Sequence, residues 1–259
     1  MKLLVKKLIE KLGYKLIKKK FMSCGIDLLH DITMDDNIDD INTVFDVGAN
    51  TGQTLRLFAD MFPRSTIYSF EPVYSSFQKL KKNNSHLDNA KLFQIGFSDE
   101  KSRVKIYHQS DSGLNSIKKS INKPDINLDN SSEEVTIDTI DSFCERNHIN
   151  QIDLLKIDAE GMDLKVIKGA KSLMKSYKIK YLLIETGFGD DNIRNTPYDD
   201  VYKYLTNRNY KLRGFFNQSN WGNVPYLVTT NSLFLLQDNW IICSIKIKVY
   251  PSSSLNKNN

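Results

Sequence analysis

The chain of 259 residues lacks the long apolar runs of membrane proteins and contains few cysteines. No stretch reaches the roughly 18 to 20 apolar residues of a spanning helix, and residues 3–5, the longest N-terminal apolar run, are too short for a signal-peptide core. Cys24, Cys144 and Cys243 lie far apart without a C-x-x-C pair, which disfavours a disulfide framework and a zinc site. We therefore expect a cytoplasmic protein with reduced thiols.

The length and the hydrophobic content of 40% suit one substantial core. We expect a single α/β domain at residues 41–240. A basic amphipathic helix and an acidic connector precede it at residues 1–40. Residues 241–259 form a C-terminal extension whose polar tail is predicted to be disordered.

Positive charge is concentrated at the N-terminus. Residues 1–20 hold eight lysines and one glutamate, a net charge of +7 against +5 for the whole chain, so the remainder carries −2. Leu4, Leu8, Leu12 and Leu16 recur at helical spacing. This helix either packs on its own domain or lies in the headgroup region of an anionic membrane. The negative remainder disfavours a nucleic-acid-binding cleft.

Short β-branched runs alternate with helical patterns from residue 43 onward, which is typical of βαβ units and a parallel sheet. The first helix places Leu55, Phe58, Ala59 and Phe62 on one face, and one later helix carries a face running from Met162 to Met174. A polar segment at residues 109–134 predicts a surface loop or lid. Strands are predicted at residues 43–47, 65–71, 91–96, 103–107, 152–158, 181–185, 210–215 and 232–236, with a further short strand after residue 135.

The turn "DVGANTG" follows the first strand, where a parallel sheet opens its ligand crevice. Gly48 and Gly52 lack a Cβ and let the backbone approach a ligand, and Asn50 or Thr51 can cap the following helix. The spacing G-x-x-x-G satisfies neither the dinucleotide fingerprint nor the Walker phosphate loop. Asp46, just before the glycines, suits an amine or a cationic ligand instead.

Glu71 ends the second predicted strand, and Pro72 restricts it to extended geometry. Its carboxylate can accept two hydrogen bonds from a ribose diol. The alternative is an exposed cap for the next helix. In combination with Asp46 and the two glycines, ribose binding is the favoured interpretation.

Several motifs together resemble the FkbM-type group of S-adenosylmethionine-dependent methyltransferases, over residues 44–236. They read "VFDVGANTGQ", "FEP", "GFSDE", "GLNSI", "VTIDTID", "DLLKIDAEGMDLKVIKGA", "YLLIET" and "LFLL". The resemblance implies a Rossmann-like seven-stranded sheet, mostly parallel with an antiparallel last strand, and helices on both faces. It also implies that the S-adenosylmethionine loop consists of Asp46, Gly48, Asn50 and Gly52. Glu71 would be the ribose ligand. Ser98 would contact the adenine, with a plain turn residue as the alternative.

Acidic residues gather where the later strands end. Lys156 and Asp158 share one face of their strand, and a buried lysine needs a partner, so Lys156 is expected to neutralise this acidic cluster as a structural ion pair or as part of a site. Methyl transfer to a hydroxyl requires positioning and a base within hydrogen-bond reach. Asp158 is the first candidate base, Glu160 the second and His108 the third, with a plain surface residue as the alternative for His108.

Two or three of these carboxylates could instead bind Mg²⁺, for which no ligands are assigned. The resemblance and the N-terminal helix favour a hydroxyl of a carbohydrate or glycoconjugate as methyl acceptor, and a lipid-linked glycan would suit membrane contact. The alternatives are another small-molecule or nucleic-acid acceptor, a nicotinamide or nucleotide-sugar enzyme, and a non-catalytic S-adenosylmethionine-binding module. No pattern names the acceptor or the oligomeric state.

Overall fold

The computed structural model describes residues 21–34, 36, 38–107, 132–220 and 227–237, together with residues 7, 9, 11–14 and 18. No helix within these residues is long and apolar enough to cross a membrane. Several predictions lie outside them: His108, nearly all of the loop at residues 109–134, most of the N-terminal helix and the tail at residues 241–259.

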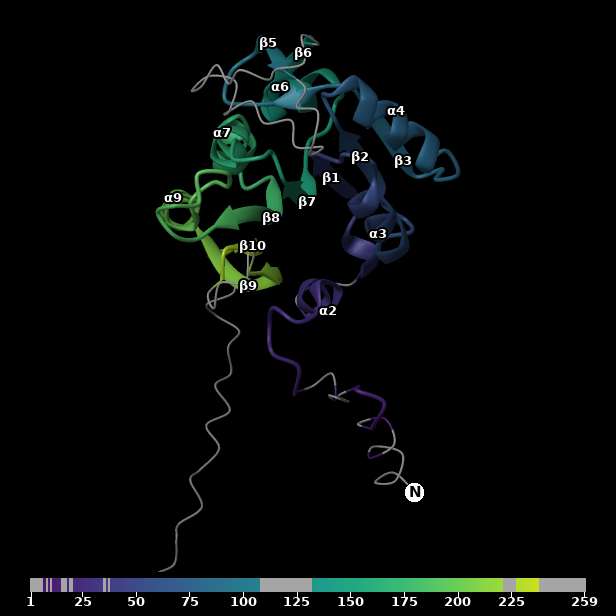
Figure 1. The fold of residues 1–259 in the computed structure, drawn as a ribbon, viewed down its shortest axis with the longest axis vertical. Coiled ribbons are helices and arrows are strands. Elements are labelled where there is room, and N and C mark those ends of the chain that lie inside the picture. Colours follow the sequence, from purple (N-terminus) through teal and green to yellow (C-terminus); the bar gives the residue numbers. More distant parts are fainter. Residues whose placement is uncertain are drawn as a thin grey trace, which may run out of the picture.

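A seven-stranded sheet forms the centre of the fold, with the strand order β3-β2-β1-β7-β8-β10-β9 (Figure 1). Strand β10 pairs antiparallel with both of its neighbours, and all the other pairs are parallel. The predicted mixed sheet with an antiparallel last strand is therefore confirmed. The strands are β1 (Thr43–Val47), β2 (Thr66–Phe70), β3 (Ala90–Phe93), β7 (Ile152–Ile157), β8 (Ile179–Gly187), β9 (Tyr210–Ser219) and β10 (Thr229–Leu236).

Helices cover both faces of this sheet, as Figure 1 shows for α3 and α4 on one side and α7 and α9 on the other. Because side chains alternate along a strand, Val44 and Phe45 of β1 point into different cores. Val44 packs with α2 (Leu28–Thr33), α3 (Gln53–Met61) and α4 (Tyr74–Asn83). Phe45 packs with α6 (Ile140–Arg146), α7 (Asp163–Lys168), α8 (Lys171–Lys175) and α9 (Tyr198–Thr206).

The predicted helix faces are partly confirmed. The predicted face of α3 is buried, with Leu55, Phe58 and Ala59 in the core. Phe62, the residue that follows this helix, is buried as well. The face from Met162 to Met174, by contrast, belongs to the two short helices α7 and α8 rather than to one helix. Gly169 lies between them, where a Cβ would overlap the carbonyl oxygen of Ser98, so a contact with a distant loop fixes this break.

A second sheet of three strands has the order β4-β6-β5, formed by β4 (Gly96–Phe97), β5 (Ser102–Tyr107) and β6 (Ser132–Asp138). The single strand predicted at residues 91–96 was wrong, because β3 ends at Phe93 and Gly96 begins β4. Residues 132–134 also belong to β6 rather than to the predicted surface loop. Glu134 is opposite Lys105 in the ladder and forms an ion pair with Arg103 at 3.7 Å, which explains polar residues in the exposed first part of β6.

Part of the predicted acidic connector is folded against the sheet. The side chain of Asp27 caps α2 by accepting a hydrogen bond from the His30 N–H at 2.9 Å. Ile32 is fully buried, and the hydroxyl of Tyr181 in β8 donates to its carbonyl oxygen at 3.3 Å. An ion pair between Lys180 and Asp36 adds a second link. These contacts hold α2 on the same face of the sheet as α3.

Candidate active site at the carboxyl ends of the strands

The glycine turn after β1 is shaped by contacts within the protein. Gly48 and Gly52 have φ values of +75° and +93°, a region that side chains rarely adopt. A Cβ on Gly48 would overlap the carbonyl oxygen of Asp158, and one on Gly52 would overlap the side-chain amide of Asn84. Packing of the residue after β7 and of the residue after α4 on the turn therefore requires glycine at both positions, and the approach of a ligand to them stays a prediction.

Helix α3 begins without a side-chain cap. Its N-cap is Gly52, and the hydroxyl of Thr51 donates to the side chain of Gln53 at 3.0 Å. The expected cap by Asn50 or Thr51 was therefore wrong. The first N–H groups of α3 have no side-chain acceptor in the described part of the chain, so they remain available to water or to an anionic group of a ligand.

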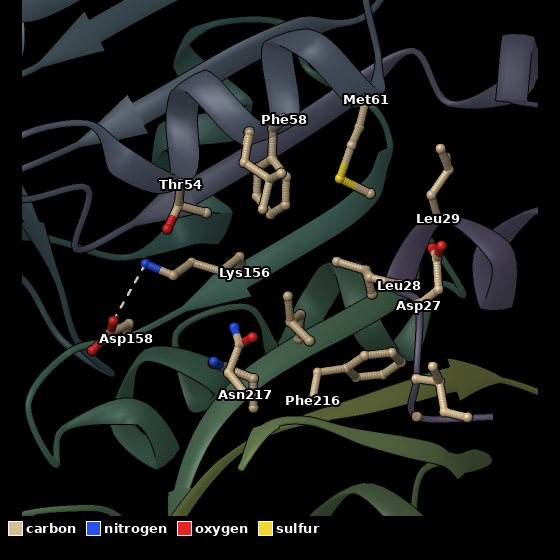
Figure 2. Close-up of a pocket in the computed structure, with 15 residues that line it drawn as sticks. Asp27, Leu28, Leu29, Thr54, Phe58, Met61, Lys156, Asp158, Phe216 and Asn217 are labelled. Carbon is tan, nitrogen blue, oxygen red and sulfur yellow. Dashed lines mark ion pairs between the residues drawn. The ribbon is translucent and has the colours of Figure 1, made fainter. Parts of the chain in front are cut away.

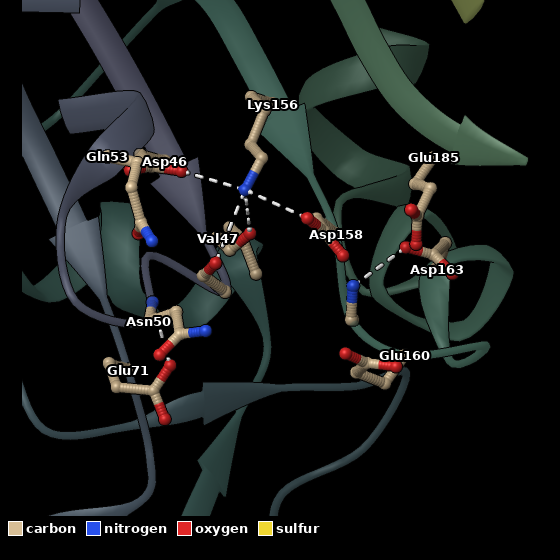
Figure 3. Close-up of polar contacts among 12 residues, drawn as sticks. Asp46, Val47, Asn50, Gln53, Glu71, Lys156, Asp158, Glu160, Asp163 and Glu185 are labelled. Atoms are coloured by element: carbon tan, nitrogen blue, oxygen red, sulfur yellow. Dashed lines mark hydrogen bonds and ion pairs between the residues drawn. The ribbon is translucent and has the colours of Figure 1, made fainter. Parts of the chain in front are cut away.

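Glu71 lies directly after β2 with its side chain held in place. Its Oε2 accepts the N–H of Asn50 and its Oε1 accepts the N–H of Val73, both at 3.0 Å (Figure 3 shows the first contact). Burial raises the pKa of Glu71, and the two N–H groups offset part of that rise. Glu71 is only 7% exposed, which disagrees with an exposed helix cap. Each oxygen keeps a second acceptor site, so the geometry fits a ribose diol, and ribose binding stays a prediction.

Ser98 directly follows β4, a strand of the three-stranded sheet. Its N–H donates to the carbonyl of Asp138 at 2.9 Å, and its hydroxyl donates to the carboxylate of Asp99 at 3.0 Å. These contacts agree with a turn residue next to the end of β6. The adenine contact predicted for Ser98 stays a prediction.

A buried ion pair joins the ends of β1 and β7. Lys156 Nζ lies 3.0 Å from Asp46 Oδ1 and 3.6 Å from Asp158 Oδ2, and it donates to the carbonyl oxygens of Val47 and Gly48 at 3.4 and 3.3 Å (Figure 3). Burial lowers the pKa of Lys156, but Asp46 and Asp158 outweigh burial and raise it. Lys156 is therefore charged. Asp46 meets a cation of its own chain where the sequence suggested a ligand cation, and its role in cofactor binding stays a prediction.

Asp158 follows β7 and Glu185 lies within the neighbouring parallel strand β8, each directly after the last residues that pair these two strands, Ile157 and Ile184. Burial, the charges of Asp158 and Asp163 and a hydrogen bond with Asp158 raise the pKa of Glu185 to about 8. Glu185 also accepts the side-chain N–H of Asn195 at 2.8 Å. The side chain of Asp158 is 38% exposed, against 5% for Lys156. Asp158 is thus a carboxylate that solvent or an acceptor can reach, and Glu160 is exposed to a similar extent, at 32%.

Glu160 and Asp163, which follow β7, each form side-chain hydrogen bonds with other residues of the chain. Arg194 forms two hydrogen bonds to Glu160, at 3.0 and 3.2 Å. Asp163 accepts the N–H of Ala159 and the hydroxyl of Thr196, each at 2.8 Å. No sequence pattern predicted a role for Arg194 or Asp163. The position of Asp163 at the start of a helix after a strand was a usable signal, whereas nothing local marks Arg194 as the partner of Glu160.

The described carboxylates do not fit a magnesium site. Among the residues that the structure describes, no group of three or more His, Cys, Asp or Glu side chains could hold a metal ion. Lys156 lies between Asp46 and Asp158, and Arg194 engages Glu160, so cations of the chain occupy the acidic cluster. A requirement for Mg²⁺ stays a prediction without assigned ligands.

A pocket of about 470 Å³ adjoins this cluster, with Lys156 and Asp158 at one end (Figure 2). It lies between α3, the segment before α2 and the strands β7 to β10. No sequence pattern predicts this pocket, because residues 25–29 reach the sheet only through tertiary packing.

Comparison with known proteins agrees with this architecture. The model of the methyltransferase FkbM domain family matches residues 46–212. A curated relative, the 2-O-methyltransferase NoeI of Sinorhizobium fredii (strain NBRC 101917 / NGR234), is 24% identical over 148 residues, which are 53% of this chain and 61% of that protein. The match therefore spans less than two thirds of the relative.

The solved structures with a similar fold have low sequence identity to this chain. Methyltransferase FkbM from Methylobacillus flagellatus KT has a TM-score of 0.49 and 16% identity, over 76% of this chain and 44% of that one. An rRNA methylase from Streptococcus thermophilus has a TM-score of 0.42 and 12% identity, over 77% and 89% of the two chains. The family match contains both the glycine turn at the end of β1 and the ion-paired end of β7. The chain belongs to the FkbM methyltransferase domain family.

Proposed function

We propose that this chain is an S-adenosylmethionine-dependent methyltransferase that acts on a hydroxyl oxygen of a carbohydrate or glycoconjugate. The observation that carries the proposal is the exposed carboxylate of Asp158, located at the carboxyl end of β7 beside the turn after β1. A hydroxyl needs a base within reach, whereas an amine that is already neutral does not. The name of the relative, a 2-O-methyltransferase, supports an oxygen acceptor.

In this proposal the first two strands bind the cofactor. Glu71 holds the ribose, the turn at residues 48–52 lies along the methionine portion, and Ser98 lies near the adenine. When bound, S-adenosylmethionine supplies the methyl group on its sulfonium. The backbone contacts of Glu71 fix its carboxylate before the cofactor arrives, which reduces the entropy that binding costs.

The end of β7 prepares the acceptor. Asp158 accepts the hydroxyl proton, and the cation of Lys156 lies 3.6 Å from its carboxylate. Glu185, protonated near neutrality, shares a hydrogen bond with Asp158 and orients it. Glu160 is the second candidate base, although it is paired with Arg194, and His108 is the third.

The test is a calorimetric titration with S-adenosylmethionine followed by methyl transfer to fractionated glycan extracts. We expect labelled methyl ethers on a sugar fraction and none with Asp158→Asn. Tight cofactor binding with no labelled glycan, or label only on nitrogen, would reject the proposed acceptor. A parallel assay in excess EDTA tests the metal, because undiminished turnover would remove Mg²⁺ from the scheme.

Contact with an anionic membrane through residues 1–20 is a separate proposal. It is supported by the net charge of +7 and the leucine spacing of that segment. We expect the full chain to sediment with anionic vesicles and a chain without residues 1–20 to remain in the supernatant. Absence of the full chain from the pellet would reject membrane contact.

A further inference from the structure

The pocket beside Asp158 has two chemically different ends. In Figure 2, Thr54, Lys156, Asp158 and Asn217 lie at one end, and Met61, Leu28, Leu29 and Phe216 lie toward the other. The apolar lining continues with residues that come from three separate elements or segments: Ile26 before α2, Leu57 and Phe58 of α3, and Leu183 of β8. A ligand that fills this space has a polar group beside the carboxylate and an apolar group away from it.

The polar end offers unused hydrogen-bonding groups. Asn217 and Asn231 line it, and within the described part of the chain neither side-chain amide forms a hydrogen bond. Asn231 is paired with Glu185 in the register of β10 and β8, so its backbone lies next to the carboxylate cluster. Each amide provides two donors and one acceptor, which suits the neighbouring hydroxyls of a sugar.

The outer wall of the pocket is firmly attached to the sheet. Gly25 approaches β9 so closely that a Cβ on it would lie 3.0 Å from the carbonyl oxygen of Phe215, and a Cβ on Gly214 would lie 2.6 Å from the N atom of Gly25. Asp31 Oδ2 accepts the N–H of Gly25 at 2.6 Å and closes this turn. The apolar side chains of residues 26, 28 and 29 therefore form a preformed wall.

The apolar end remains partly open to solvent. Leu57 is 52% exposed and Ile26 is 56% exposed, although both line the pocket. Exposed apolar side chains that border a cavity gain free energy when a ligand covers them. The volume of about 470 Å³ lies within the range of small-molecule sites.

We propose that this pocket binds the apolar aglycone of the methyl acceptor, so that the acceptor is a sugar joined to an alkyl or lipid-like group. The inference rests on the proposed function, because it takes the reacting hydroxyl to lie at Asp158. The sugar occupies the end formed by Asp158, Asn217 and Asn231. The alkyl chain extends from there between α3 and the wall at residues 25–29.

The test compares ligands that differ only in the apolar group. The full-length protein, saturated with S-adenosylhomocysteine, is titrated calorimetrically with octyl and methyl β-D-glucoside and with octyl and methyl β-D-galactoside, all below the critical micelle concentration. We expect at least one octyl glycoside to bind at a single site, roughly 100-fold more tightly than its methyl counterpart.

Two matched substitutions locate the site. Leu57→Glu places a charge in the apolar end and should weaken the octyl glycoside at least about 10-fold. Met34→Glu is the control, because Met34 is 55% exposed and does not line the pocket, so binding should remain unchanged. Unchanged affinity for S-adenosylhomocysteine shows that both variants are folded.

The outcomes separate this inference from the proposed function. Equal affinity for octyl and methyl glycosides overturns the aglycone site, even if glycans are methylated. The same holds if Leu57→Glu and Met34→Glu lose the same affinity for the octyl glycoside. Binding that depends on the octyl chain and is lost only in Leu57→Glu supports the site, even if no glycan accepts a methyl group and the proposed function fails.

Discussion

Lys156 Nζ lies 3.0 Å from Asp46 Oδ1, and this pair links the ends of two neighbouring parallel strands. Both side chains are almost fully buried, at 5% and 0% exposure. Lys156→Met leaves the carboxylate of Asp46 buried without its partner. We expect the free energy of unfolding to fall by about 3 to 5 kcal/mol, as measured by urea denaturation.

The double variant Lys156→Met with Asp46→Leu is the control, because it removes both charges. It should recover most of the lost stability, since a buried pair can often be replaced by apolar residues at little cost. A single variant within about 1 kcal/mol of the wild type would contradict the importance of the pair.

Glu71→Ala tests the ribose ligand. The substitution removes the carboxylate that fixes the N–H of Asn50 and that we expect to accept the diol, so affinity for S-adenosylhomocysteine should fall roughly 10- to 100-fold in calorimetry. Glu133→Ala is the matched control, because Glu133 accepts the nearby N–H of Tyr74 at 3.0 Å without lying at the crevice. Equal affinity in both variants would remove Glu71 from the site.

Asp158→Asn tests the base. The amide keeps the size of the side chain but cannot accept a proton at neutral pH, so kcat should fall roughly 10²- to 10⁴-fold while cofactor affinity changes less than about threefold. Glu160→Gln should have a smaller effect, because its carboxylate is already paired with Arg194. If Glu160→Gln is the slower variant in steady-state assays, the order of the two candidates is reversed.

Glu185 should make stability depend on pH. Its pKa rises from 4.5 to about 8 in the folded protein, so the folded protein holds this proton more tightly than the unfolded chain. The resulting stabilisation is complete below about pH 4.5, falls as the pH rises and is lost above about pH 8. The slope is roughly 1 kcal/mol per pH unit within this window.

Glu185→Gln removes this titration while it keeps an acceptor for Asn195. Urea denaturation between pH 5 and about pH 8 should therefore show the variant gaining stability over the wild type with each pH unit. A constant difference between the two proteins across this range would mean that Glu185 titrates normally.

Periodicity and spacing predicted the central strands well, because β1, β7 and β8 are buried on both faces. They also predicted α3, which is buried on one face. Leu55 and Phe58 needed no tertiary information to be placed in a core. The resemblance supplied the antiparallel last strand, for which no local signal exists. The break between α7 and α8 escaped prediction, since it depends on the contact between Gly169 and the distant carbonyl of Ser98.

The candidate site was only partly visible in the sequence for the same reason. Lys156 was expected to neutralise carboxylates, but its nearest partner is Asp46, which precedes it by more than a hundred residues and becomes its neighbour through the pairing of β1 and β7. The pairing of Glu160 with Arg194 also depends on how a loop folds back. Side chains that meet across separate loops leave no periodic pattern.

The close approach of Gly25 to Gly214 has a practical consequence for recombinant work. A shortened protein that starts at residue 41, the boundary suggested by composition, would retain every strand but lose the covering over the end of β9 and expose Tyr181 and Phe216 to water. Such a fragment would be prone to aggregation during purification. Expression designs should therefore begin upstream of Cys24.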